Sequence, residues 1–73
     1  MKQSLRAARI NKGYTQKNAA ELFGVHYQTL AKWERNNSRM PYEAIAKIQN
    51  IYGIAPDEIF FGDINDFIRS TNE

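Results

Sequence analysis

The stretch Gln16–Arg35, QKNAAELFGVHYQTLAKWER, decides the fold of this chain. Two short amphipathic helical patterns meet here at Gly24, a residue type that accepts the positive φ of a tight turn without strain. Ala20 lies four residues earlier, where two helices joined by such a turn approach most closely and a larger side chain would force them apart. The spacing therefore predicts two helices joined by a tight turn, although two ordinary core helices would show the same apolar periodicity.

Cap residues and glycines divide the rest of the chain into further helices. Ser4 and Thr15 are good N-caps, and Gly13 supplies the left-handed residue that ends a helix. We expect helices over about 5–12, 16–23, 27–35 and 42–52, a short fifth helix from Pro56 to Phe60 or Phe61, and one or two further turns beyond Gly62. Because no segment shows useful strand alternation, the predicted fold class is all-α.

Length and composition exclude several kinds of protein. A chain of 73 residues makes one small domain with a modest core. Without cysteine and with a single histidine, it offers no disulfide, no thiolate site and no evident metal cluster, so we expect no metal and no cofactor. The N-terminal sequence MKQSLRAARINKG lacks the apolar stretch of a signal peptide, and no run approaches the ~20 residues of a membrane span. The expected location is the cytoplasm of a bacterial cell, with no membrane partner.

Charge is distributed unevenly along the chain. Residues 1–42 contain eight of the ten basic residues and two of the eight acidic ones, whereas residues 43–73 are acidic on balance. A polyanion would be attracted to the first part and repelled by the second. Small domains also become lopsided by chance, so the charge alone does not identify a partner.

The predicted helix over residues 27–35 has two distinct faces. Leu30 and Trp33 lie on the face that must pack inward. The opposite face carries polar and cationic side chains around one alanine: Tyr27, Gln28, Ala31, Lys32 and Arg35. Glutamine can bond bidentately to adenine, and lysine can donate to guanine or to phosphate in a DNA major groove. An ordinary solvated helix face favours the same residue types, so both interpretations stay open at this point.

With these residues in place, the chain resembles the lambda-repressor-like, Cro/CI-type helix-turn-helix family. The shared pattern runs without insertion from Leu5 to Gly62 and includes Arg9, Gly13-Tyr14-Thr15-Gln16, Ala19-Ala20, Phe23-Gly24-Val25, Thr29-Leu30, Trp33-Glu34, Pro41, Ile48, Tyr52-Gly53-Ile54 and Asp57-Glu58-Ile59-Phe60. The resemblance implies a five-helix DNA-binding domain over residues 1–62, with the helix-turn-helix at the second and third helices. The tail, residues 63–73, is expected to form a short sixth helix for dimer or partner contact.

The resemblance also implies roles for matching residues. Tyr27, Gln28 and Lys32 correspond to base-reading positions of the third helix. The expected phosphate contacts are Gln16, Lys17, His26, Thr29, Arg35, Asn37 and Arg39. The resemblance implies that Gln16 also supports a base-reading side chain. Its phosphate contact suits its place at a helix N-terminus, which offers free amides to phosphate. Arg9 and Glu34 match a partly buried ion pair between the first and third helices, which implies a structural role.

The chain departs from the family pattern in three places. His26 stands where a small hydroxyl residue is commoner, so it is either a plain N-cap or a phosphate ligand. Tyr27 is bulky for the first reading position and would stack or contact a thymine methyl group instead of pairing through an amide. Asn36 and Asn37 replace a frequent glycine, and asparagine can adopt the same left-handed backbone at some cost.

The C-terminal part carries more large apolar side chains than a five-helix core obviously needs. Phe60, Phe61, Ile64, Phe67 and Ile68 are candidates for a homodimer interface on DNA, or they simply cap the core. Modules of this type commonly pair on two half-sites, and we expect any pairing to use this domain itself.

Two functions are consistent with these features. The first is a sequence-specific transcriptional regulator similar to a Cro-like phage or prophage repressor, with a double-stranded DNA operator as its partner. The alternative is an antirepressor, or modulator of repression, that binds a cognate CI-type repressor protein through its helix-turn-helix domain. The sequence has no Gly-rich phosphate loop and no nucleophile–base arrangement, so we expect no enzyme and no catalytic residue.

Overall fold

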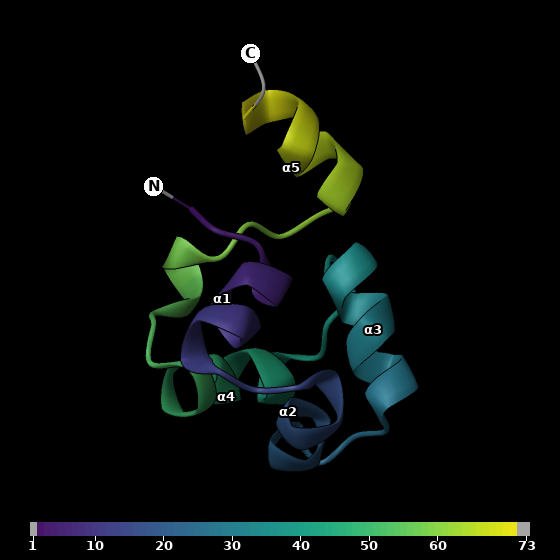
Figure 1. Cartoon of the computed structure of the whole chain (residues 1–73). Helices are drawn as coiled ribbons and strands as arrows, with labels where there is room; N and C mark the ends of the chain where they lie inside the picture. The colour runs from purple at the N-terminus through teal and green to yellow at the C-terminus, as the bar shows by residue number, and fades with distance from the viewer. Residues whose placement is uncertain (1, 72–73) are drawn as a thin grey trace.

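The computed structural model describes residues 2–71, which form five α-helices and one 3₁₀ turn (Figure 1). The elements in chain order are α1 (Leu5–Lys12), α2 (Gln16–Phe23), α3 (Tyr27–Arg35), α4 (Tyr42–Tyr52), the 3₁₀ turn η1 (Pro56–Glu58) and α5 (Ile64–Thr71). The all-α class and the positions of the first four helices are confirmed. Within the described range, no helix is long and apolar enough to cross a membrane.

Local hydrogen bonds fix the ends of the first two helices as the sequence predicts. The Ser4 hydroxyl accepts from the amide of Ala7 at 3.0 Å, and the Thr15 hydroxyl accepts from the amide of Asn18 at 3.1 Å. Gly24 ends α2 with φ 78°, which is the left-handed geometry that allows α3 to start almost at once. The tight turn between α2 and α3 is therefore built from a cap, a glycine and a short connection.

The core lies between α1, α2, α3 and α4. Its largest fully buried side chains are Leu5, Leu30, Ile48 and Ile59, which come from three helices and from the segment after η1. Phe23 of α2 packs its ring edge-on against Trp33 of α3 and Tyr52 of α4, with ring centroids 6.0 and 5.5 Å apart. These contacts hold the turn unit against α4 and leave the opposite face of α3 uncovered.

The expected fifth helix, Pro56 to Phe60 or Phe61, is wrong in its extent. It is a three-residue 3₁₀ turn, after which Ile59 takes an extended backbone. Ile59 forms a parallel bridge with Gln3: Gln3 donates to the carbonyl of Glu58, and Phe60 donates to the carbonyl of Gln3, both at 2.9 Å. Pairing with the N-terminal segment satisfies these backbone groups while burying Ile59 completely, so the helix does not continue.

The loop after α3 also differs from expectation. Asn36 is extended, with φ −157°, and the positive φ values within the described residues all belong to glycines. The left-handed asparagine expected here is therefore wrong. Instead, the Asn37 amide donates to the carbonyl of Phe60 at 3.1 Å and accepts from the amide of Gly62 at 2.9 Å. This buried side chain fastens the loop to the segment that leads into α5.

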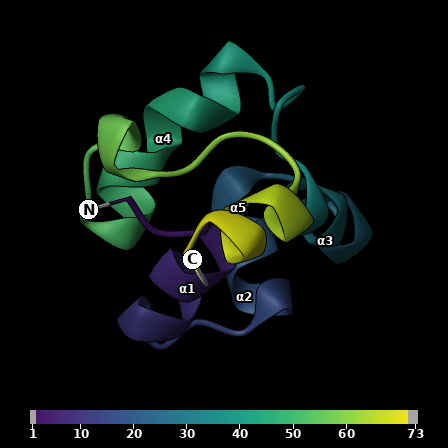
Figure 2. The ribbon, with the colours of Figure 1, turned by 90° about the horizontal axis from the view of Figure 1, so that it is seen from above.

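The expected C-terminal turns form the eight-residue helix α5. Figure 2 shows α5 crossing over α1, with one end beside α3. Phe67 stacks on Phe60 with ring centroids 4.9 Å apart, which holds the helix against the segment that precedes it. The last residues of the expected tail, 72 and 73, lie outside the described range.

Candidate nucleic-acid interface

Helix α3 presents opposite chemistry on its two sides. Leu30 is completely buried and Glu34 is 7% exposed, whereas the residues expected to read bases, Tyr27, Gln28 and Lys32, are exposed. This is the division that a period of 3.6 residues predicts for a helix packed on one side. The three predicted base-reading residues therefore share the uncovered side of α3.

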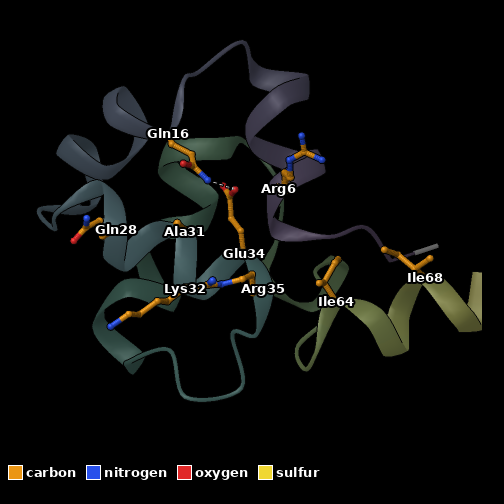
Figure 3. Close-up of a pocket in the computed structure, with 9 residues that line it drawn as sticks. All are labelled: Arg6, Gln16, Gln28, Ala31, Lys32, Glu34, Arg35, Ile64 and Ile68. Atoms are coloured by element: carbon orange, nitrogen blue, oxygen red, sulfur yellow. Dashed lines mark hydrogen bonds between the residues drawn. The ribbon is translucent and has the colours of Figure 1, made fainter.

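A groove of about 630 Å³ runs along this side of α3 (Figure 3). Its lining comes from four helices: Arg6 of α1, Gln16 of α2, Gln28, Ala31, Lys32, Glu34 and Arg35 of α3, and Ile64 and Ile68 of α5. Three of these side chains are cations, two are amides, and the acid among them is committed to an internal ion pair. The groove therefore offers hydrogen-bond donors and positive charge to an anionic ligand, next to an apolar wall.

A buried network supports the groove from behind. The Nε atom of Arg9 lies 2.7 Å from Oε2 of Glu34, and Nη1 of Arg9 donates to the carbonyl of Tyr14 at 2.9 Å. The ion pair predicted between Arg9 and Glu34 is thus present, and it ties α1 to α3. Gln16 joins the network, because its Nε2 donates to Oε1 of Glu34 at 2.9 Å, as the dashed line in Figure 3 marks. The N-terminus of α2 is thereby fixed relative to the exposed side of α3.

Tyr52 is buried in the core, close enough to Glu34 and Arg9 for their charges to act on its hydroxyl. Burial, followed by the negative charge of Glu34, raises the pKa of the Tyr52 hydroxyl well above its usual value. Among the described residues, the hydroxyl finds no hydrogen-bond partner. Tyr52 therefore contributes an aromatic ring to the core and a buried polar atom that the packing does not satisfy.

His26 and Tyr27 form the exposed tip at the start of α3. The Nδ1 atom of His26 accepts from the backbone amide of Gln28 at 3.2 Å, so the imidazole is the N-cap of α3. The Tyr27 ring lies against it, with ring centroids 4.4 Å apart and an interplanar angle of 32°. Of the two roles weighed for His26, the cap is present, and within residues 2–71 no hydrogen bond occupies Nε2.

The residues expected to contact phosphate differ in how far they are exposed. Lys17, Arg35 and Arg39 are exposed cations, while Thr29 and Gln16 are partly buried. Asn37 differs, because its side chain is 3% exposed and both ends of its amide bond to the backbone of the segment before α5. The expectation of a phosphate contact from the Asn37 side chain is therefore corrected: this side chain holds the fold together.

The candidate interface residues are also divided by the structure. Phe61 packs against the core, and Phe60 and Phe67 pack against each other. Ile64 and Ile68 line the groove beside α3, and both also line a second groove between α1 and α5. Part of this set thus caps the core, as the alternative supposed, and part forms a surface on α5.

Three features of the site were missed by sequence reasoning. Arg6 lines the groove from α1, and the basic residues of that helix could have indicated such a contribution. The bond from Gln16 to Glu34 joins residues 18 positions apart, and nothing in the local pattern indicates it. The approach of Ile64 and Ile68 to the exposed side of α3 depends on how α5 packs, which the sequence did not specify.

Within residues 2–71, no group of three His, Cys, Asp or Glu side chains could hold a metal ion.

Comparison with known proteins agrees with this architecture. The helix-turn-helix family model matches residues 5–59, so the chain belongs to this XRE-type, lambda-repressor-like family. It is 32% identical over 59 residues to the HTH-type transcriptional regulator ImmR of Bacillus subtilis, covering 81% of this chain and 46% of the relative. It is 28% identical over 60 residues to the SPbeta prophage-derived uncharacterized HTH-type transcriptional regulator YonR of the same organism, covering 82% and 56%. The chain spans about half the length of these curated relatives.

Proposed function

We propose that the chain is a sequence-specific DNA-binding transcriptional regulator that inserts α3 into the major groove. The observation that carries this proposal is that Gln28 and Lys32 of α3, Gln16 of α2 and two arginines open onto one groove. Amide and lysine side chains suit base edges, and arginines beside them suit the flanking phosphates. Two relatives named as transcriptional regulators add support. The proposal includes a Cro-like role in a phage or prophage and a place in the bacterial cytoplasm, and it assigns no catalysis or cofactor.

Tyr27, Gln28 and Lys32 are the proposed base readers. The proposed phosphate contacts are Gln16, Lys17, His26, Thr29, Arg35 and Arg39, with Arg6 added from the lining of the groove. The Nε2 of Gln16 has one hydrogen left after its bond to Glu34, so a phosphate contact remains compatible with the network.

Pairing of two copies on DNA is part of the proposal. A single module buries roughly 600–1,000 Å² on DNA, which is little for tight specific binding. We propose that the apolar side of α5, including Ile64 and Ile68, contributes to the contact between copies bound at half-sites about one helical turn apart. A selected operator with inverted half-sites at that spacing is the expected result.

The test is selection of duplexes from a random-sequence library by the whole chain, followed by a salt titration of binding. An enriched sequence should bind far more tightly than a scrambled duplex of equal length. Its log affinity should fall with log salt by about 0.9 per phosphate contact. Binding without sequence preference would contradict the proposed function.

A second candidate function is supported by the mixed chemistry of the groove. Ile64 and Ile68 give it an apolar wall beside the cations, which suits a protein partner as well as DNA. In this alternative, the domain is an antirepressor that binds a CI-type repressor. A tight complex with the repressor encoded next to it, together with weak, sequence-blind DNA binding, would favour this function over the first.

A further inference from the structure

His26 and Tyr27 form a stacked aromatic pair at the N-terminal end of α3. Because Nδ1 of His26 accepts the amide hydrogen of Gln28, the neutral imidazole must carry its proton on Nε2. The cap therefore fixes both the position and the tautomer of this ring. Tyr27 then lies on a fixed imidazole, at a centroid distance of 4.4 Å, instead of rotating freely in solvent.

This arrangement presents apolar surface at the start of α3, next to polar side chains of the proposed reading set. Tyr27 is 45% exposed, whereas its neighbours in the proposed reading set, Gln28 and Lys32, offer amide and ammonium groups. In the major groove, the apolar group on a base edge is the C5 methyl group of thymine, which 5-methylcytosine also carries. The first residues of a recognition helix lie closest to the base edges, so the ring is at the position where such a methyl group would be met.

We propose that Tyr27 determines specificity by packing its ring against a pyrimidine C5 methyl group, and that His26 is its positioning residue. This inference rests on the proposed function, because it requires α3 in the major groove. A serine would cap the helix as well as histidine does, so capping alone does not account for an imidazole here. The ring adds a stacking surface that fixes Tyr27 before DNA arrives, and ordering a side chain in advance strengthens binding.

The experiment removes the thymine methyl group from the DNA and the Tyr27 ring from the protein, separately and together. The probe is the tightest-binding duplex enriched by the whole chain from a random-sequence library, with each thymine replaced in turn by uracil. This replacement removes the methyl group and keeps the base pair. At one position in the half-site, we expect uracil to weaken wild-type binding about fourfold, the value of one buried methyl group. For Tyr27→Ala, the same replacement should leave affinity unchanged.

Three further variants separate the ring from other effects. Tyr27→Phe keeps the ring and should keep the fourfold penalty. Tyr42→Ala removes an 80% exposed tyrosine from the start of α4 and should also keep it. His26→Ser keeps a cap and loses the imidazole, so it should retain the wild-type midpoint of thermal unfolding while lowering the penalty for uracil. If His26 acts only as a cap, His26→Ser should show the full fourfold penalty for uracil. That result would overturn its positioning role.

Cytosine derivatives distinguish the two sources of the methyl group. At the sensitive position, a 5-methylcytosine·guanine pair should bind about fourfold more tightly than a cytosine·guanine pair. If it does not, the C5 methyl group does not by itself account for the preference at this position and the proposal fails. The proposal also fails if no replacement of thymine by uracil weakens binding, or if Tyr27→Ala shows the same penalty as wild type. In both cases the duplex would still be bound specifically, so the proposed function would stand. No enriched duplex at all would contradict the proposed function itself.

Discussion

The side-chain amide of Gln16 donates to Oε1 of Glu34 at 2.9 Å and so joins the N-terminus of α2 to a buried ion pair. A carboxylate can only accept hydrogen bonds, so the Nε2 end of the Gln16 amide faces inward. Glu34 also binds Arg9 through Oε2, which means that one carboxylate holds α1, α2 and α3 in register. The geometry of the exposed side of α3 therefore depends on a buried carboxylate behind it.

Substituting Glu34 should destabilise the whole domain. In Glu34→Gln, the 90% buried side chain of Arg9 loses its counter-charge and keeps its own positive charge. Removing one partner of such a pair costs about 3–5 kcal/mol, a large part of the stability of a small domain. Urea denaturation followed by circular dichroism measures the change. A free energy of unfolding within 1 kcal/mol of wild type, by that rough scale, would contradict the assigned role.

The exposed pair of Arg69 and Asp66 on α5 supplies the matched control. Its side chains are 76% and 60% exposed, so solvent screens their interaction. Asp66→Asn should change the free energy of unfolding by less than about 1 kcal/mol. The double variant Arg9→Met with Glu34→Leu should recover much of the stability lost in Glu34→Gln, because it buries no unpaired charge.

Asn37 should prove structural, not a DNA contact. Asn37→Ala leaves the carbonyl of Phe60 and the amide of Gly62 without their side-chain partner, and this should cost about 1–3 kcal/mol for each group that stays buried. Asn36→Ala is the matched control, because that side chain is exposed and accepts hydrogen bonds from the amide and hydroxyl of Ser38 in its own turn. Equal, small losses of stability in the two variants would contradict the assignment.

The helices could be predicted from the sequence because local chemistry determines their ends. Ser4, Thr15 and Gly24 act through groups three or four residues away, within the range that a sequence pattern can capture. The segment after Pro56 could not be predicted in the same way. Its backbone pairs with Gln3, more than fifty positions earlier, and this contact replaces a helix that local signals favour.

The same distinction applies to the candidate site. The exposed side of α3 follows from helical periodicity, which is why Tyr27, Gln28 and Lys32 were found together. The buried state of Asn37 depends on the path of the chain before α5, and its amide looked like any polar loop residue. Sequence reasoning thus identified the exposed side of α3 and missed contacts that depend on how distant segments meet.

Replacing Tyr52 by phenylalanine should not destabilise the domain. The Tyr52 hydroxyl is buried without a partner in the described structure, so Tyr52→Phe removes an unsatisfied polar group and keeps the ring. We expect a free energy of unfolding equal to wild type or up to about 1 kcal/mol higher, measured by urea denaturation at neutral pH. A loss of that size would indicate that the hydroxyl makes a stabilising bond in solution.

The pH dependence of the same variant tests the raised pKa of Tyr52. Because burial raises this pKa in the folded state, the unfolded chain loses the proton first, near the usual value of 10.0. Below that pH, ionisation of this hydroxyl does not lower the free energy of unfolding. Above it, the free energy of unfolding falls by up to about 1.4 kcal/mol per pH unit. Tyr52→Phe lacks this loss, so the difference in unfolding free energy between it and wild type should widen from pH 8 to pH 11, values chosen to be about two units below and one above the usual pKa.

If α3 reads DNA, substitutions of Gln28 and Lys17 should weaken DNA binding in different ways. Gln28→Ala removes a base contact, so binding to the selected duplex should weaken by about 1–3 kcal/mol and the preference at one base pair should disappear. Lys17→Ala removes a phosphate contact, so binding to every duplex should weaken similarly and the salt slope should fall by about one. Fluorescence anisotropy on the selected duplex, its single-base variants and a scrambled duplex, at several salt concentrations, separates the two patterns. An unchanged base preference in Gln28→Ala would remove Gln28 from the reading set, and an unchanged salt slope in Lys17→Ala would remove Lys17 from the phosphate contacts.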